Sequence, residues 1–104
     1  MPEELAKDII DILNNHILIV SSDLSHYYTY EKANKLDSFT NKAISSLNIE
    51  KAENMEACGK TGILTLLHIA KELGWTCQLL EYKNSGDTWG DKTNVVGYSS
   101  FAFF

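Results

Sequence analysis

Apolar residues recur at helical spacing in three stretches of the chain. Residues 3–15 carry one apolar stripe, residues 30–47 carry a second, and residues 60–73 are apolar on nearly every side. The third stretch is therefore predicted to form the most buried helix. Gly74 follows it directly and suits a left-handed helix C-cap.

Three further stretches predict strands. Residues 17–20 form a short, wholly apolar run, which is typical of a buried strand. Residues 75–82 and 95–104 are the other candidates. Residues 48–56 are predicted to be a connector or a short helix, and residues 83–94 a loop. This order predicts an α/β fold, a small mixed sheet covered by helices, with the first and last strands in the interior of the sheet.

Composition narrows the classes of partner and the cellular location that we expect. The chain of 104 residues is one small domain, with nine lysines, no arginine and a net charge of −5. That balance argues against nucleic acid or an anionic membrane as a partner, because phosphate binding depends on Lys and Arg. No run is long enough to span a bilayer, and no basic-then-apolar signal segment is seen. Cys58 and Cys77 are not expected to form a disulfide, and a reducing cytoplasm is the predicted location.

Residues 21–26 form a dense polar loop that follows the predicted first strand. Ligands of α/β sheets bind beyond the carboxyl ends of strands, and here Asp23 is close enough to orient His26. A carboxylate that holds an imidazole fixes its tautomer and raises its basicity. The alternative is an ordinary loop in which Ser22, Asp23 or Ser25 caps the next helix.

The two cysteines differ in setting. Cys58 and Gly59 come at the start of the predicted third helix, where the helix N-terminus lowers the pKa of a thiol. Cys58 is then either a nucleophile or metal ligand, or a small buried apolar residue. Cys77 lies in a predicted strand and is expected to belong to the core.

The remaining polar candidates carry weaker signals. His68 lies among leucines in a helix and is expected to pack there, and His16 follows a helix end. Neither histidine has a partner at zinc-like spacing. Asp87 closes the stretch 84–87, which is either a simple turn or a way to bring Asp87 near a site.

Four motifs in order resemble the signatures of the MEMO family: IVSSDLSHY at 19–27, ACG at 57–59, YKNSGD at 82–87 and VVGY at 95–98. The family is similar in fold to class III extradiol dioxygenases, so the resemblance implies half of such a domain. Animal members include the mediator of ErbB2-driven cell motility. Microbial members belong to the AmmeMemoRadiSam group, which implies AMMECR-type and radical-SAM proteins as partners.

The resemblance also implies roles for single residues. In the family a cleft holds a metal through two histidines of the first half and one cysteine of the second half. Cys58 matches that cysteine, His26 matches the acid/base histidine of the ring-opening enzymes, and Asp23 matches a carboxylate of the same cleft. The other residues expected to line the cleft are Ser22, Ser25, Gly59 and Asp87.

The two metal-binding histidines of the family have no counterpart here. Residues 1–104 therefore correspond to the carboxyl-terminal half of a MEMO domain, whose partner is the missing amino-terminal half or a second copy. A thiolate ligand favours redox-active iron or copper in the intact domain, whereas this chain alone is expected to bind no metal. The function is either a share in a non-haem metal redox site or that of a non-catalytic module that engages a peptide or protein.

Overall fold

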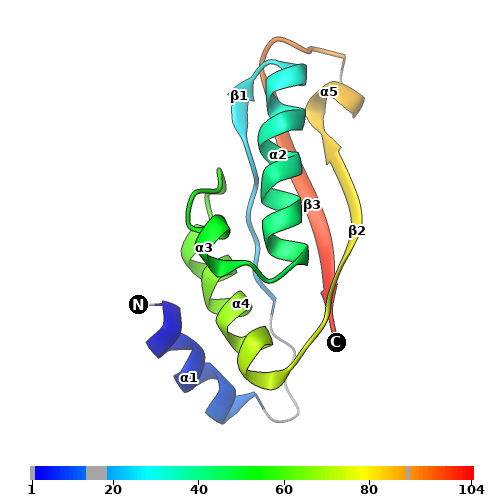
Figure 1. Ribbon diagram of the computed structural model, residues 1–104. Helices are drawn as coiled ribbons and strands as arrows, with labels where there is room; N and C mark the ends of the chain where they lie inside the picture. Colours follow the sequence, from blue (N-terminus) through cyan, green and yellow to red (C-terminus); the bar gives the residue numbers. More distant parts are fainter. Residues whose placement is uncertain (1, 14–18, 89) are drawn as a thin grey trace.

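The computed structural model describes residues 2–13, 19–88 and 90–104 (Figure 1). Within these ranges the chain forms five helices and three strands. In chain order they are α1 (Pro2–Ile12), β1 (His26–Tyr28), α2 (Tyr30–Ser45), α3 (Ile49–Ala52), α4 (Lys60–Leu73), β2 (Cys77–Asn84), α5 (Ser85–Thr88) and β3 (Val95–Phe103).

The three strands form one sheet in the order β1-β3-β2. Both pairings are antiparallel: Cys77 lies opposite Phe103, Asn84 lies opposite Gly97, and His26 lies opposite Val96. The near-continuous apolar run of β3 thus occupies the centre of the sheet, as predicted, and Val95 at its start is completely buried.

Helix α2 packs on β2 and β3 and runs along the sheet (Figure 1). Its N-cap is Thr29, whose side chain accepts a hydrogen bond from the Lys32 amide. The cap therefore does not come from the serines or the aspartate of residues 21–26. The predicted α/β class, a small sheet covered by helices, is confirmed. The predicted sheet is mixed, whereas both pairings among the described residues are antiparallel.

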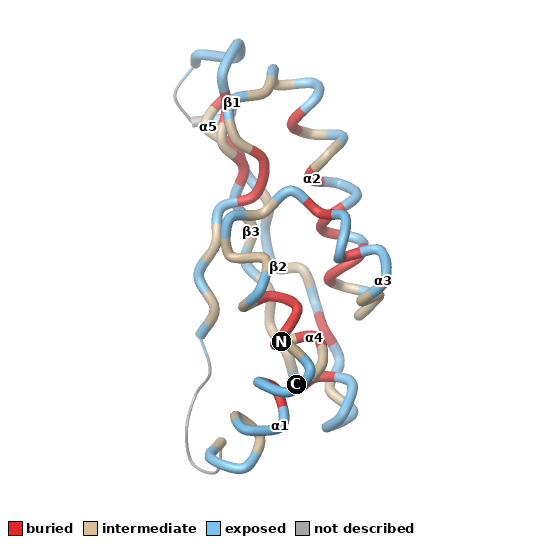
Figure 2. The backbone as a smooth tube through the Cα atoms, turned by 90° about the vertical axis from the view of Figure 1, so that its left-hand side faces the viewer, coloured by how far each residue is buried: buried red, intermediate tan, exposed pale blue. Residues whose placement is uncertain are grey.

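Helix α4 has the bounds that its apolar pattern predicts. Gly74 follows it with φ +70° and donates its N–H to the Ala70 carbonyl, which confirms the left-handed C-cap. Figure 2 shows buried residues along α2 and α4, and α1 packs against α4. The buried apolar cluster joins α2, α3, α4 and β2 through Ala43, Ile44, Ala52, Met55, Ile63, Leu64, Leu67 and Cys77.

The prediction of a strand at residues 17–20 is wrong at residues 19 and 20, which are the two that the structure describes. Ile19 and Val20 lie in no strand and Ile19 is 83% exposed, while 17 and 18 lie outside the described residues. The strand of this region is β1, which begins in the expected polar loop. An apolar run shows only that a segment gains from apolar contact, whereas strand formation needs a partner with free backbone groups.

Other elements differ from the prediction mainly at their ends. Strand β2 extends to Asn84, and the expected loop after it contains the short helix α5. Helix α1 ends at Ile12, while Asn14, Asn15 and His16 lie outside the described residues. No described helix is long and apolar enough to cross a membrane.

The chain is less compact than its length would allow. Its radius of gyration is 14.2 Å and its extents are 44 × 25 × 18 Å. A typical domain of this length has a radius of gyration of about 13 Å. Several large apolar side chains are correspondingly exposed, among them Ile12, Ile19 and Leu80.

Replacing Gly74 by Ala should destabilise the fold. A Cβ at this position meets no atom within 4 Å, so the cost is conformational only, because φ is +70°. We expect the free energy of unfolding in urea to fall by about 1 kcal/mol. Gly74→Asn is the matched control and should lose less, because Asn tolerates the left-handed region; equal losses would contradict this reasoning.

Candidate functional site

The polar loop is held against β3 by backbone hydrogen bonds. Leu24 donates to the Gly97 carbonyl at 2.8 Å, and Gly97 donates to the Ser25 carbonyl at 3.0 Å. These two bonds extend the pairing of β1 with β3 back into residues 24–25. Residues 22 and 23 thereby come to lie at the edge of the sheet, next to the start of α4.

A second set of hydrogen bonds joins the loop to the segment before α4. Cys58 donates its amide to the Asp23 carbonyl at 3.1 Å, and Gly59 donates its amide to Ser22 Oγ at 2.7 Å. The approach is so close that a Cβ on Gly59 would lie 2.7 Å from the Ser21 carbonyl oxygen. Only glycine therefore fits at the N-cap of α4.

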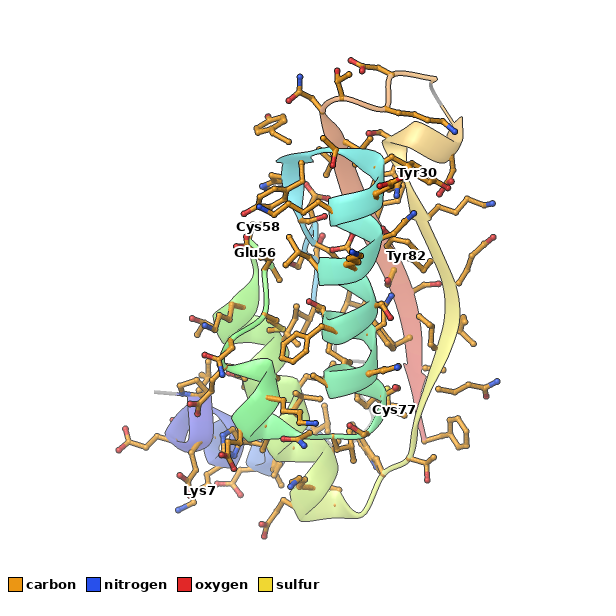
Figure 3. All side chains as sticks on the ribbon, turned by 45° about the horizontal axis from the view of Figure 1, so that its top comes forward. Lys7, Tyr30, Glu56, Cys58, Cys77 and Tyr82 are labelled. Carbon is orange, nitrogen blue, oxygen red and sulfur yellow. The ribbon has the colours of Figure 1, made fainter. Side chains whose placement is uncertain are left out.

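These contacts bring Asp23, His26 and Cys58 together. One ligand atom from each of the three side chains lies within 4.8 Å of the others. His26 Nε2 is 3.5 Å from Asp23 Oδ2, and the two side chains are 38% and 55% exposed. Cys58 is also exposed, at the tip of the segment that leads into α4 (Figure 3). The convergence expected from the sequence is thus present, although 32 positions separate His26 from Cys58.

The surroundings of Cys58 favour its thiolate. The Ser22 hydroxyl, 3.6 Å from Sγ, and the Asp23 amide, which donates to Sγ at 3.2 Å, lower the pKa of Cys58. Ser22 Oγ also lies 2.7 Å from the Asp23 carbonyl, so its single hydroxyl proton can bond either that carbonyl or the sulfur.

Cys77 has the opposite environment. It is buried in the apolar cluster, and burial raises its pKa to about 11. Both cysteines are free thiols, which confirms the prediction that they form no disulfide. Any thiolate chemistry of the chain near neutral pH therefore belongs to Cys58.

The other predicted site residues lie in different places. Ser22 and Gly59 form the junction beside Cys58, as described above. Ser25 is completely buried, with its hydroxyl bonded to Asp37. Asp87 accepts hydrogen bonds from the Tyr30 hydroxyl at 2.6 Å and the Asn84 amide at 2.9 Å, and these bonds lower its pKa. It is not one of the three clustered ligand groups found among the described residues.

Two residues beside the cluster gave no signal in the sequence. The Tyr28 hydroxyl donates to Glu56 at 3.2 Å, and this bond raises the pKa of Tyr28. Tyr28 and His26 are two positions apart in β1, and Glu56 and Cys58 are two positions apart before α4. The Tyr28–Glu56 bond is therefore a further bridge between the same two segments. Only the tertiary pairing of these segments reveals it.

Tyr27, between His26 and Tyr28, has φ +62°. The pairing register of β1 with β3 shifts at this residue, and Tyr27 is 74% exposed. A non-glycine residue at positive φ is uncommon, and bulges of this kind redirect neighbouring side chains. The irregularity thus sets how β1 presents its side chains next to the cluster.

Comparison with known proteins gives a consistent result. The sequence model of the family described as "Memo-like protein" matches residues 1–102. A "MEMO1 family protein" of Desulfurococcus amylolyticus is 39% identical over 94 residues, which cover 85% of this chain and 33% of the relative. Proteins of the same name from Methanobrevibacter smithii and Aquifex aeolicus are 38% and 34% identical, covering 86% and 96% of this chain but 34% and 42% of their own lengths. The chain thus spans about a third to two fifths of these relatives.

Replacing Ser22 by Ala should make Cys58 less reactive at neutral pH. The variant loses the hydroxyl that lowers the Cys58 pKa, so the pH at which iodoacetamide alkylation is half-maximal should move upward. Peptide mapping separates Cys58 from Cys77. Ser21→Ala removes a neighbouring hydroxyl that has no bond to sulfur and should leave the profile unchanged; an unshifted profile in Ser22→Ala would refute the assignment.

Proposed function

Because this chain belongs to the Memo-like protein family, we propose that it supplies one part of a metal-dependent redox site. Cys58 provides a thiolate ligand, and His26, oriented by Asp23, acts as general acid and base. The observation that carries the proposal is the convergence of these three side chains from two distant segments. The chain spans only about a third of the length of its relatives. We therefore propose the redox activity for the whole Memo-like protein, of which this chain supplies one part.

The donor set fits a transition metal. Metal–nitrogen and metal–sulfur bonds of about 2.0–2.3 Å allow two ligand atoms of one ion to lie up to about 4.5 Å apart. The three ligand atoms lie within 4.8 Å of one another, so an ion held by Cys58 would lie close to Asp23 and His26. Thiolate and imidazole suit iron and copper, and a bound redox-active ion would supply one-electron chemistry.

The acid/base role follows from the position of the imidazole. A proton on His26 Nε2 faces the Asp23 carboxylate at 3.5 Å, which leaves a lone pair on Nδ1. His26 can then accept a proton at Nδ1 and return it, while Asp23 stabilises the cationic ring. Partial exposure of both side chains keeps them within reach of a small molecule.

Metal retention should require more than this chain. Stable transition-metal sites use three or four protein donors, and we assign one ligand, Cys58, to this chain. We therefore expect the purified chain to lose iron, copper or zinc on washing with a chelator. A chimaera in which the chain replaces the matching 94-residue segment of the Desulfurococcus amylolyticus relative should retain about one metal per molecule. Elemental analysis of both proteins is the measurement.

Two variants make this test specific. Cys58→Ser in the chimaera should lose most of the metal, whereas Cys77→Ala removes the buried thiol and should not. Cobalt titration provides a second readout, since the near-ultraviolet thiolate band should be absent only in Cys58→Ser. Metal bound firmly by the isolated chain, or retained by the Cys58→Ser chimaera, would contradict the proposal.

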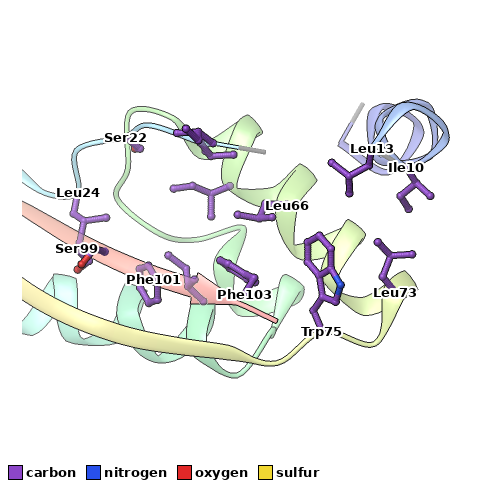
Figure 4. A pocket seen from close by; sticks show the side chains of 15 residues that line it. Ile10, Leu13, Ser22, Leu24, Leu66, Leu73, Trp75, Ser99, Phe101 and Phe103 are labelled. Carbon is purple, nitrogen blue, oxygen red and sulfur yellow. The ribbon is translucent and has the colours of Figure 1, made fainter. Parts of the chain in front are cut away.

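A second candidate function, a non-catalytic module that completes a larger protein, is supported by an apolar groove. The groove has a volume of about 840 Å³ (Figure 4). Its lining comes from α1 and the residue after it, α2, α4, the link from α4 to β2, β3 and the segment before β1. It includes Ile10, Leu13, Ile19, Leu66, Trp75, Phe101 and Phe103. We assign it to the remaining Memo-like polypeptide, because the relatives hold about twice as much further sequence to cover it. We further propose AMMECR-type and radical-SAM proteins as partners of the completed protein.

Without that polypeptide the chain should associate with itself through the groove. Contiguous exposed apolar surface drives association. Sedimentation velocity should show dimers or larger species, and Ile19→Ser should shift the population toward monomer. Leu80→Ser is the matched control, because Leu80 is 59% exposed on β2 and does not line the groove. A monomer at high concentration, or equal effects of both variants, would be evidence against this surface.

A further inference from the structure

Asp37 is a completely buried carboxylate in the middle of α2. Among the described residues it forms no ion pair. It instead accepts three hydrogen bonds: from the Ser25 amide at 3.0 Å, from the Ser25 hydroxyl at 2.9 Å and from the Tyr82 hydroxyl at 2.6 Å. A buried polar group without partners is costly, so each of the three donors stabilises the buried carboxylate.

The Asp37 side chain meets three other parts of the fold. Tyr82 belongs to β2, and its hydroxyl bonds Asp37 of α2 (Figure 3). Burial together with this bond raises the pKa of Tyr82, so that its hydroxyl stays protonated and donates. On β3, a Cβ on Gly97 would overlap the Asp37 carboxylate, so the backbone there passes directly over it. The third part is Ser25 in the polar loop.

Ser25 has every polar group engaged. Its amide and hydroxyl bond Asp37, and its carbonyl accepts from the Gly97 amide at 3.0 Å. It lies two positions after Asp23 and directly before His26. The side chains of Asp23 and His26 are themselves partly exposed, so their placement depends on the backbone between them.

We propose that Asp37 is a positioning residue for the candidate metal site: by fixing Ser25 it holds the carboxylate of Asp23 and the imidazole of His26 next to Cys58. This inference rests on the proposed function of that site. Asp37 itself touches neither the cluster nor its solvent-exposed side. Its effect is transmitted through the backbone of residues 23–26, which also carries the amide that donates to Cys58 Sγ.

Three variants separate positioning from general stability. Ser25→Ala removes the hydroxyl bond, and Asp37→Asn removes one of the two acceptor oxygens. Tyr82→Phe removes a bond to the same carboxylate without touching the polar loop, and so serves as the control. All three are expected to lower the free energy of unfolding, but only the first two release the loop.

The first readout needs no metal. Amide hydrogen exchange at Asp23 to His26 should become about tenfold faster in Ser25→Ala and Asp37→Asn, which corresponds to the loss of about one hydrogen bond. The rate of Cys58 alkylation at a fixed neutral pH should fall several-fold in the same variants. Amide exchange in α4 serves as the measure of global stability. Once corrected for that measure, neither loop exchange nor Cys58 alkylation should change in Tyr82→Phe. Unchanged loop exchange in Asp37→Asn and Ser25→Ala would overturn the proposal, as would equal changes in Tyr82→Phe.

The second readout is metal content in the chimaera described above. Loss of metal in Asp37→Asn, with the fold intact by circular dichroism, supports positioning of the complete site. If the loop readouts change but the parent chimaera binds no metal, the metal function fails while the role of Asp37 in ordering the loop stands. If the parent binds metal and both Asp37→Asn and Ser25→Ala retain it fully, the positioning role is wrong and the metal function stands.

Discussion

The close approach of the polar loop to the start of α4 is the constraint on which the candidate site depends. Two amides, those of Cys58 and Gly59, donate across this junction to Asp23 and Ser22. A side chain larger than hydrogen at Gly59 would separate the two segments. The junction therefore does two things at once: it satisfies the two backbone donors that directly precede α4, and it places a thiol beside a carboxylate and an imidazole.

The polar loop is also held on its other side, by β3 and α2. Residues 24 and 25 are bonded to Gly97 on β3, and Ser25 is bonded to Asp37 on α2. A central strand and the helix that covers it thus carry the exposed cluster on a buried polar network. Such an arrangement suits a site whose reacting groups must stay accessible while their backbone stays fixed.

Much of the apolar surface around the groove is not covered by the rest of the chain. One face of β3, together with α1 and α4, surrounds a large open groove, and the chain is less compact than typical for its length. The buried polar groups of Ser25 and Asp37 are bonded within the chain, whereas apolar surface is left uncovered. The difference is consistent with relatives about three times as long as the matched segment, because hydrophobic burial is the part of folding that most needs additional chain.

Local pattern predicted α2, α4 and β3 well, because each has a sustained periodicity or a long apolar run. It failed at Ile19 and Val20, which line the groove and form no ladder. It also missed β1, since three polar and aromatic residues carry no strand signal until β3 lies beside them. The family resemblance identified Asp23, His26 and Cys58, but no spacing rule would have distinguished the exposed Ser22 junction from the buried Ser25.

The sequence by itself determined the fold class, the bounds of the most buried helix, its glycine cap and the absence of a disulfide. These follow from local properties: periodicity, backbone conformation and the chemistry of single residues. The tertiary structure alone decided that Asp37 faces Ser25, that Tyr28 reaches Glu56 and that Asp87 bonds Tyr30. Each of these contacts joins residues far apart in sequence, and the physical reason is that only the packing of α2 on the sheet and of α4 against the loop sets which distant polar groups must satisfy one another.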